Sequence, residues 1–335
     1  MSTRTVAKET TRERNSFNNH IWVNLSNYWT LGILVLIITI FGVIEPRFLS
    51  RSNWLSTTTY MTETMLLAIS ETFVIITAGI DLSVGATEGL AGVVAALVIL
   101  KTLAIGTTLS LILGVISGLL VGMVVGLVNG LVITKMKITP FIVTLGTMGI
   151  ATGLTFIFSG GTDVVGLPAS LNEIGNSIIA GWLSFPVTIT IIVLILAGIW
   201  LSKTRFGQYT YAIGSNAEAS RRAGIRVDNH LIKVYMLGGL IASLSGVLLL
   251  TRFATASPLT GANSELNAIA AVVIGGTSLF GGRGTMFGSL VGAGIISVLV
   301  TGLVIVNVLP YWQVVAIGVI IILAVWFDQL HHRSS

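Results

Sequence analysis

Two acidic side chains of this sequence lie within long apolar stretches, where carboxylates are costly. Glu71 has apolar neighbours and no basic residue nearby in sequence, and Asp81 interrupts the next stretch. Such acids usually face a bundle interior or water and mark the path of a polar solute or an ion. We therefore take Glu71, Asp81 and the neighbouring Ser83 as candidates for lining a path; for Glu71 the alternative is a protonated or hydrogen-bonded packing residue. Glu63 and Glu88 lie nearer to the ends of apolar stretches, where we expect them to be solvated.

The residues around Asp81 allow two structural interpretations. Asp81 or Ser83 can cap a helix that begins at Val84 by accepting hydrogen bonds from its free N–H groups. Gly79 and Gly85 can instead mark a break in a discontinuous helix that lines a cavity. The two interpretations are compatible, and the sequence leaves both open.

The polar stretch 203–233 contains the signature of one short helix, Asn216–Ala223. Ser215 and Glu218 form the predicted capping box at its start. Arg221 and Arg222 place cations in the last turn, and Gly224 provides the left-handed residue that ends the helix. About two turns are too short to be stable alone in water, so another surface must hold this helix. The small side chains of Ala217 and Ala219 would fit a groove on another protein, and packing against the chain's own bundle is the alternative.

Several kinds of chemistry have no sequence signature here. A P-loop requires Gly-Lys followed by Ser or Thr, and the sequence contains no Gly-Lys dipeptide. The run Gly281–Gly284 misses the dinucleotide fingerprint and precedes an apolar stretch, so we interpret Gly281 and Gly282 as a helix break or a close-packing point. The sequence has no cysteine and no nucleophile elbow. We expect the chain to be no enzyme and to bind no metal.

The elements that must position these residues are membrane helices. Only 9% of the 335 residues are charged and 53% are hydrophobic, against about 25% charged residues in a soluble domain. Ten apolar stretches recur, most of them long enough to cross a bilayer: 28–44, 65–80, 84–100, 109–133, 141–158, 185–201, 234–250, 268–280, 287–306 and 314–327. Since lipid cannot satisfy backbone polar groups, they predict an all-α integral membrane protein of about ten transmembrane helices. The short stretch 268–280 suits a broken or tilted span.

The positions of the basic residues predict the orientation. With a cytoplasmic N-terminus and ten crossings, 14 of the 18 lysines and arginines fall inside. The outer ones are Arg47, Arg51, Lys101 and Arg252. The positive-inside rule therefore places both termini in the cytoplasm. The predicted organisation is a cytoplasmic segment 1–27, a transmembrane domain 28–328 with the cytoplasmic loop 203–233, and a cytoplasmic tail 329–335.

Glycines form a regular stripe in one stretch. Every fourth residue from 114 to 130 is glycine, which includes Gly118, Gly122 and Gly126. This spacing lets helix backbones approach closely within lipid. Because each four-residue step rotates the stripe by roughly 40°, the glycines cannot all face one straight neighbour. We expect the stretch to wind between several helices.

Three motifs together resemble the ribose-type permeases, the membrane subunits of bacterial importers for ribose, xylose, arabinose, galactose and related solutes. They are Gly79–Gly85, the loop Gly214–Gly224, and Glu265–Leu279 followed by Gly281 and Gly282. The resemblance covers essentially Trp29–Asp328. The third motif adds Asn267 as a candidate for lining the path; relatives often have Asp at this position. It also adds Gly275 and Gly276 as positions of a helix break or of close packing. Relatives also often have glycine where this chain has Ser70 and Ala78.

The resemblance implies a set of partners. These are a second permease copy, an ATP-binding subunit with two nucleotide-binding modules that holds ATP and Mg, and a periplasmic sugar-binding protein. The chain itself would bind no cofactor and no nucleic acid, and it would lie among the lipids of the bacterial inner membrane. The short helix near Ala219 would be the coupling helix that inserts into the ATPase. The outer segment 160–182 would dock the binding protein, with a plain solvated loop as the alternative.

The function expected from these features is that of a permease subunit of an ATP-driven monosaccharide importer working by alternating access. Two alternatives belong to other classes. An ion-coupled secondary transporter would use Glu71 or Asp81 as a relay, and a passive channel would need neither energy nor an ATPase. Transport by the purified chain alone would discriminate these, because the importer subunit needs its partners.

Overall fold

A computed structural model describes residues 29–333, with the side chains at 321, 324, 325 and 327–333 excepted. The predicted segment 1–27 and the end of the predicted tail lie outside the described residues. Helices dominate. After an apolar helix at Trp29–Ile44, the elements are η1 (Pro46–Leu49), α2 (Arg51–Ile76), α3 (Val84–Thr102), η2 (Leu103–Ile105), α4 (Thr107–Lys135), α5 (Pro140–Ser159), α6 (Ala169–Gly175), β1 (Ile178–Ile179), β2 (Leu183–Ser184), α7 (Phe185–Lys203), α8 (Arg205–Ser215), α9 (Ala217–Arg222), α10 (Val227–Phe253), α11 (Ser264–Ile274), α12 (Met286–Ile305) and α13 (Pro310–Arg333).

Seven of the described helices are long and apolar enough to cross a membrane, namely α2, α3, α4, α5, α7, α10 and α12. Three shorter apolar helices, Trp29–Ile44, Ser264–Ile274 and Pro310–Ile320, fall in other predicted stretches. The prediction of a multi-pass helical membrane protein is confirmed, and the count of ten stays a prediction. The small antiparallel hairpin β1–β2, with Ile178 opposite Ser184, is an addition that the sequence did not predict.

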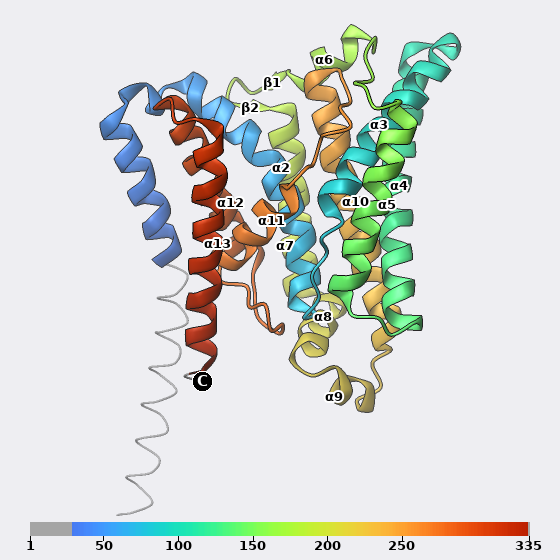
Figure 1. The fold of residues 1–335 in the computed structure, drawn as a ribbon, viewed down its shortest axis with the longest axis vertical. Coiled ribbons are helices and arrows are strands. Elements are labelled where there is room, and N and C mark those ends of the chain that lie inside the picture. Colours follow the sequence, from blue (N-terminus) through green and yellow to red (C-terminus); the bar gives the residue numbers. More distant parts are fainter. Residues whose placement is uncertain (1–28, 334–335) are drawn as a thin grey trace, which may run out of the picture.

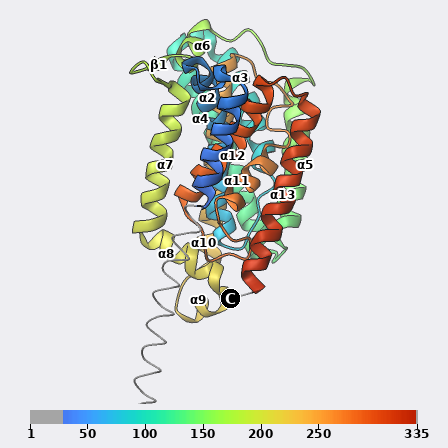
Figure 2. The same ribbon diagram turned by 90° about the vertical axis from the view of Figure 1, so that its left-hand side faces the viewer.

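The long helices run roughly side by side along the long axis of the molecule (Figure 1). One end, here called the upper end, carries α6 and the β1–β2 hairpin. The opposite, lower end carries α8 and α9, and the described chain also finishes there. Turning the molecule places α7 on one flank and α5 with α13 on the other (Figure 2). The site residues are therefore held within a bundle that has two distinct polar ends.

Helices α2, α10 and α12 form the centre of the bundle, while α4, α5 and α7 lie at its periphery. The core includes fully buried Ile69 and Phe73 of α2, Tyr235 of α10 and Ile296 of α12. The peripheral helices instead expose many large aliphatic side chains. This distribution suits a bundle surrounded by lipid, whose tails make no demand for polar surface.

The glycine stripe of α4 passes between two neighbouring helices, as predicted. A Cβ atom on Gly118 would lie 3.1 Å from the Ala91 carbonyl oxygen of α3, and one on Gly130 would lie 2.7 Å from the Ile232 Cα of α10. At Gly122 and Gly126 an added Cβ would overlap the backbone of α10. Close approach of three backbones therefore requires glycine at these positions, and it is the packing contact that lipid-embedded helices use for association.

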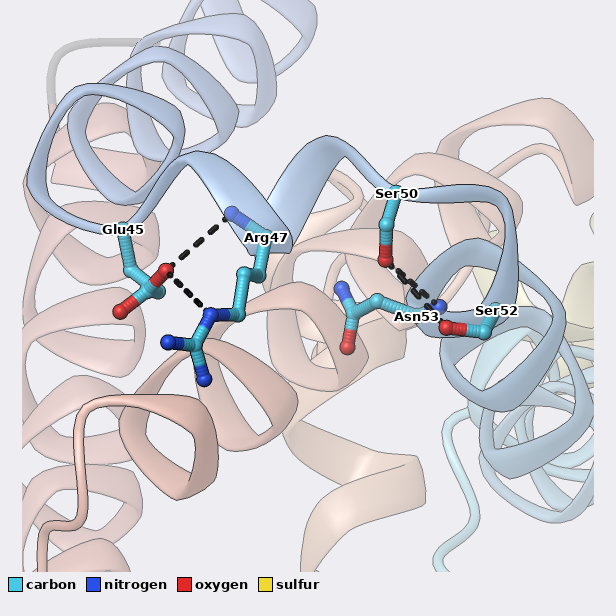
Figure 3. A network of polar contacts seen from close by, with 5 residues as sticks. All are labelled: Glu45, Arg47, Ser50, Ser52 and Asn53. Carbon is cyan, nitrogen blue, oxygen red and sulfur yellow. Dashed lines mark hydrogen bonds and ion pairs between the residues drawn. The ribbon is translucent and has the colours of Figure 1, made fainter.

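A tight turn at the upper end joins the first helix to α2 (Figure 3). The Glu45 carboxylate accepts a hydrogen bond from the Arg47 backbone N–H at 3.2 Å, and the Arg47 Nε lies 3.6 Å away. Ser50 is the N-cap of α2, and its hydroxyl oxygen accepts from the Asn53 N–H at 3.3 Å. The Asn53 side chain in turn donates to the Phe48 carbonyl at 2.7 Å. These local bonds fix the direction in which α2 enters the bundle.

Candidate functional site

The first component of the candidate site is a break between α2 and α3. Residues 77–83 are not helical, and Ala78 has a left-handed φ of 61°. Asp81 Oδ1 accepts hydrogen bonds from the Ser83 N–H at 2.9 Å and the Ser83 hydroxyl at 2.6 Å. The break expected at Gly79–Gly85 is therefore present. The capping hypothesis is wrong in detail, because Ser83 is the N-cap of α3 but its hydroxyl donates to Asp81 instead of accepting from the first turn.

Side chains of two other helices hold this break in place. Asn129 of α4 donates from Nδ2 to the Ser83 hydroxyl at 2.9 Å. Thr144 of α5 donates to the Ile80 carbonyl at 3.1 Å. Both contacts satisfy polar groups that the interrupted helix cannot satisfy by itself. The non-helical segment is thus a fixed part of the interior.

A second break follows α10, which ends at Phe253. Ala254 has a left-handed φ of 49°, and the chain then turns several times before α11 begins at Ser264. The two breaks meet inside the molecule. A Cβ atom on Gly85 would lie 2.6 Å from Glu265 Oε2, and one on Gly89 would lie 2.5 Å from the Thr260 carbonyl oxygen. The N-termini of α3 and α11 therefore lie close to each other.

The glycines predicted to end or pack helices after α11 do so. Gly275 is the C-cap of α11 and faces the Gly288 backbone of α12, where a Cβ would overlap it. Gly276, Gly281 and Gly282 have left-handed φ angles of 86°, 83° and 73°. A side chain would be strained at all three. The connection between α11 and α12 depends on these residues.

Buried acids surround the two breaks. Glu71 is fully buried in α2, as expected for an interior acid, and its Oε2 is 3.5 Å from the Asp81 backbone nitrogen. Glu71 and Asp81 are therefore neighbours at the first break. A helix N-terminus carries partial positive charge, so the starts of α3 and α11 favour acidic groups nearby. Asn267 is half-buried on α11.

The prediction that Glu63 and Glu88 are solvated is wrong for Glu88. Glu88 is fully buried, and its Oε1 accepts a hydrogen bond from the Ser245 hydroxyl at 2.5 Å. Glu63 is half-buried and accepts from the Ser264 hydroxyl at 2.5 Å. The error arises because α3 begins inside the bundle, so its first turns, which carry Glu88, do not reach an aqueous end. Among the described residues, Glu71 Oε1 and Glu88 Oε2 are buried without a hydrogen-bond partner.

The predicted short helix of the loop 203–233 is α9, Ala217–Arg222. Its cap differs from the prediction. Asn216, with extended backbone angles, is the N-cap, and its Oδ1 accepts from the Ala219 N–H at 2.8 Å. Because α8 continues through Ser215, the Ser215 hydroxyl instead donates to the Tyr211 carbonyl at 2.9 Å. Glu218 pairs with Arg222 on the same helix.

Helix α9 projects from the lower end, away from the bundle (Figures 1 and 2). Ala219, Glu218 and Arg222 are exposed, whereas Ser220 is buried. The connection to α10 is fixed by Gly224, with a left-handed φ of 87°, and by an ion pair of 2.8 Å between Arg221 and Asp228. The face that carries Ala219 is therefore open to a partner. This favours the groove interpretation over packing against the chain's own bundle.

Helix α8 connects α9 to the first break and to the segment that joins α11 to α12. The Tyr211 hydroxyl donates to the Gly284 carbonyl at 2.7 Å, and burial raises the pKa of Tyr211, which keeps the donor proton in place. The Gly282 N–H donates to the Ile76 carbonyl at the end of α2 at 2.8 Å. A Cβ on Gly214 would overlap that same carbonyl. We call residues 278–284 the glycine turn; it touches α8 on one side and the α2 break on the other.

A separate set of contacts fixes the segments at the upper end. Asn172 and Asn176 of the α6 region donate to the Arg252 carbonyl at 2.8 and 2.9 Å. The Arg51 guanidinium donates to the Gly181 carbonyl and lies 5.2 Å from the centre of the Trp182 ring. Asp163 and Glu173 of segment 160–182 are exposed. The segment is thus an ordered platform with acidic side chains on its surface.

Sequence reasoning did not single out Asn129, Thr144, Tyr211, Ser245 or Ser264. Asn129 had a detectable signal, because it is an amide within the apolar stretch 109–133. An amide there must find a partner inside the bundle. The others are hydroxyl residues, which often bond their own helix backbone, and their long-range partners depend on tertiary packing.

Comparison with known proteins identifies what the chain resembles. The model of the family described as branched-chain amino acid transport system / permease component matches residues 53–325. The ribose import permease protein RbsC of Bacillus subtilis (strain 168) is 40% identical over 301 residues, which cover 89% of this chain and 91% of that protein. No solved structure gives a significant match.

Two further relatives are permeases for other sugars. The D-allose transport system permease protein AlsC of Escherichia coli (strain K12) is 35% identical over 328 residues, 97% of this chain and 98% of the relative. The fructose import permease protein FrcC of Rhizobium meliloti is 37% identical over 318 residues, which cover 89% of this chain and 84% of the relative. The similarity extends over nearly the whole length of each chain.

Proposed function

The chain belongs to the permease-component family of branched-chain amino acid transport systems, and from its sugar-import relatives we propose that it is the membrane-spanning subunit of an ATP-driven monosaccharide importer. The observation that carries the proposal is similarity to import permeases for ribose, allose and fructose over 84% or more of each relative. It fits the absence of a P-loop from the sequence. Energy then comes from a separate subunit.

We propose a ten-pass arrangement with both termini in the cytoplasm. The seven candidate spans and three shorter apolar helices support this count, because each of the ten predicted apolar stretches overlaps one of them. Lys203, Arg221 and Arg222 lie at the lower end, near α9, which would then be cytoplasmic. The upper end would face the periplasm of a bacterial inner membrane.

In this arrangement, α9 docks into an ATP-binding subunit that carries two nucleotide-binding modules and holds the ATP and Mg. Its exposed Ala219 and its capped, isolated geometry support the assignment. Two permease copies form the transporter, and a periplasmic sugar-binding protein docks on segment 160–182. The exposed Asp163 and Glu173 provide charged docking positions.

Transport proceeds by alternating access. ATP binding and hydrolysis move α9, and through α8 and the glycine turn they shift the chain at the two breaks. The bonds from Tyr211 to Gly284 and from Gly282 to Ile76 supply a continuous route for this displacement. Glu71, Asp81, Ser83 and Asn267 are the residues of this chain proposed to lie along the path. Their contacts with sugar need only be weak, since the binding protein supplies the affinity.

Reconstitution tests the proposal against an ion-coupled transporter and a passive channel. Liposomes that contain the purified chain alone should take up no D-ribose, D-allose, D-galactose or D-fructose, with or without an ion gradient. Adding the ATP-binding subunit, the binding protein and ATP should start uptake of at least one of them. Uptake by the chain alone would contradict an ATP-driven importer and would support one of the two alternatives.

A further inference from the structure

A cavity of about 200 Å³ lies near the upper end of the bundle, between α3, α10 and the segment that follows α10. We call it the upper cavity. Its lining includes Glu63 of α2, Leu249 and Phe253 of α10, and Thr255, Ser257 and Thr260 of the connecting segment. Helix α10 ends at Phe253 beside α6, so the cavity lies toward the end that would face the periplasm (Figure 1).

Glycines let the walls of the cavity approach one another closely. Gly89 of α3 and Gly246 of α10 line the cavity, and a Cβ atom on them would lie 2.5 Å from the Thr260 carbonyl oxygen and 2.0 Å from the Glu88 carbonyl oxygen, respectively. Backbone contacts hold the remaining wall, because Val164 and Ala256 exchange hydrogen bonds of 2.9 and 3.1 Å. The cavity is therefore bounded by packed helices and by a segment anchored to the upper platform. It is a built feature of the fold.

The lining suits a small neutral polyol. Among the described residues that line the cavity, Glu63 is the charged one, and the polar side chains beside it are hydroxyls. A carboxylate with hydroxyls accepts hydrogen bonds from ligand hydroxyls, and Leu249 with Phe253 offers an apolar surface for ring C–H groups. Pockets for drug-sized ligands are roughly 300–1,000 Å³, so this space suits a smaller molecule. Arg252 does not line the upper cavity but a smaller space next to Glu63.

A second acid lies directly behind the wall. A Cβ atom on Gly261, which lines the cavity, would lie 3.2 Å from Glu88 Oε2. That oxygen is fully buried and lacks a hydrogen-bond partner among the described residues. Glu88 therefore adds a second acidic group close to the cavity without lining it.

We propose that the upper cavity is a transient subsite for a neutral monosaccharide, whose hydroxyls donate to Glu63 and whose C–H face packs against Leu249 and Phe253. This inference rests on the proposed function, because it places the sugar at one point of the import path. The subsite receives sugar from the periplasmic side before the breaks near Asp81 rearrange. Its acidic lining disfavours solutes that carry a carboxylate.

Cysteine labelling tests the subsite directly, because the sequence contains no cysteine. The complete transporter with Thr255→Cys, or separately with Ser257→Cys, is treated with a membrane-impermeant methanethiosulfonate in the absence of the binding protein. D-ribose, D-xylose, D-allose, D-galactose and D-fructose are added in turn at high concentration, with L-leucine as a carboxylate-bearing solute. Thr162→Cys, exposed on the upper platform and outside the cavity, is the control.

The expected result is that a transported sugar slows labelling at residues 255 and 257 several-fold and leaves residue 162 unchanged. Equal labelling with and without every transported sugar would overturn the subsite, as would equal protection by L-leucine. A wild-type transporter that moves none of these sugars with ATP would instead contradict the proposed function. The two failures are thus distinguishable.

Filling the cavity gives an independent measurement. Leu249→Trp places a larger ring in the lining, and Leu240→Trp makes the same change at a half-buried position of α10 outside it. Sugar uptake should fall about tenfold or more for Leu249→Trp at matched membrane abundance, while ATP hydrolysis stimulated by the binding protein is retained. Equal uptake by the two variants would overturn the proposal.

Discussion

At the residue scale, Glu71 is the clearest test of whether an interior acid belongs to the transport path. Its carboxylate is fully buried, with one oxygen near the Asp81 N–H and the other unpaired among the described residues. Glu71→Gln keeps the size and the acceptor but removes the ionisable group. We expect sugar uptake to fall several-fold at unchanged membrane abundance, with Glu45→Gln in the surface turn before α2 as the control. Unchanged uptake would show that Glu71 only packs.

Asn129 tests the polar network around the first break. Asn129→Ala removes the donor to Ser83 and leaves buried polar groups without a partner, which costs about 1–3 kcal/mol. We expect a clearly lower thermal midpoint in detergent. Ser117→Ala on the same helix is the matched control, because its hydroxyl bonds only the local Gly114 carbonyl at 2.8 Å. Equal midpoints for the two variants would contradict a structural role of the network.

The sequence predicted single residues only where local chemistry decides the outcome. Glu71 had to be interior because lipid does not tolerate a carboxylate, and this holds. Glu88 was misplaced because its burial depends on where α3 begins within the bundle. The cap of α9 fell on Asn216 instead of Ser215, because the length of α8 is set by packing against the glycine turn. Pairings between distant residues, such as Ser245 with Glu88, leave no local pattern.

At the element scale, the glycine stripe of α4 should be the most sensitive packing surface. A Cβ on Gly122 would overlap the Gly239 carbonyl and the Ser243 side chain of α10. Gly122→Ala should therefore lower stability by about 1–3 kcal/mol, the usual cost of overpacking. Gly146→Ala in α5 is the control, since nothing lies within 4 Å of its added Cβ. Thermal unfolding in detergent should separate them, and equal stability would refute the close packing.

The contact between α8 and the glycine turn should couple the lower end to the breaks. Tyr211→Phe removes the hydroxyl that donates to Gly284 and keeps the ring, a loss of about 0.5–1.5 kcal/mol. We expect assembly with the ATP-binding subunit and basal ATP hydrolysis to persist, while sugar transported per ATP falls several-fold. Tyr209→Phe, two residues away on the same helix and packed near the His230 ring, is the control. An unchanged transport ratio for Tyr211→Phe would rule out this route.

The existence of the membrane helices was predictable because hydropathy alone requires them. The stretch 109–133 became α4, and the short stretch 268–280 became α11 and the glycine turn. The places where helices stop inside the bundle were visible as Gly79, which follows α2, and Gly275, which caps α11. The meeting of the two breaks was not predictable, because the contact of Gly85 with Glu265 joins residues far apart in sequence.

At the scale of the whole molecule, the bundle separates two polar ends that differ in structure. The lower end presents α9, which is short, capped by Asn216 and exposed at Ala219. The upper end holds the platform 160–182 and the upper cavity. The basic residues of the loop 203–233 predict that the lower end is cytoplasmic, and this stays a prediction. The upper cavity could not be predicted, because its walls come from three separate parts of the chain.

The central claim is that a separate ATPase drives this chain through α9, and Ala219→Trp tests it most directly. The large ring lies outside the membrane spans, so insertion into the membrane should be normal. The ring should not fit a groove on the ATP-binding subunit that is made for small side chains, because overpacking costs about 1–3 kcal/mol. The measurement is copurification of the ATP-binding subunit and ATP hydrolysis stimulated by sugar-loaded binding protein, at matched membrane abundance. Thr162→Trp, on the exposed opposite end, is the control. We predict that Ala219→Trp loses both signals while Thr162→Trp retains copurification; full binding and stimulation in Ala219→Trp would contradict coupling through α9.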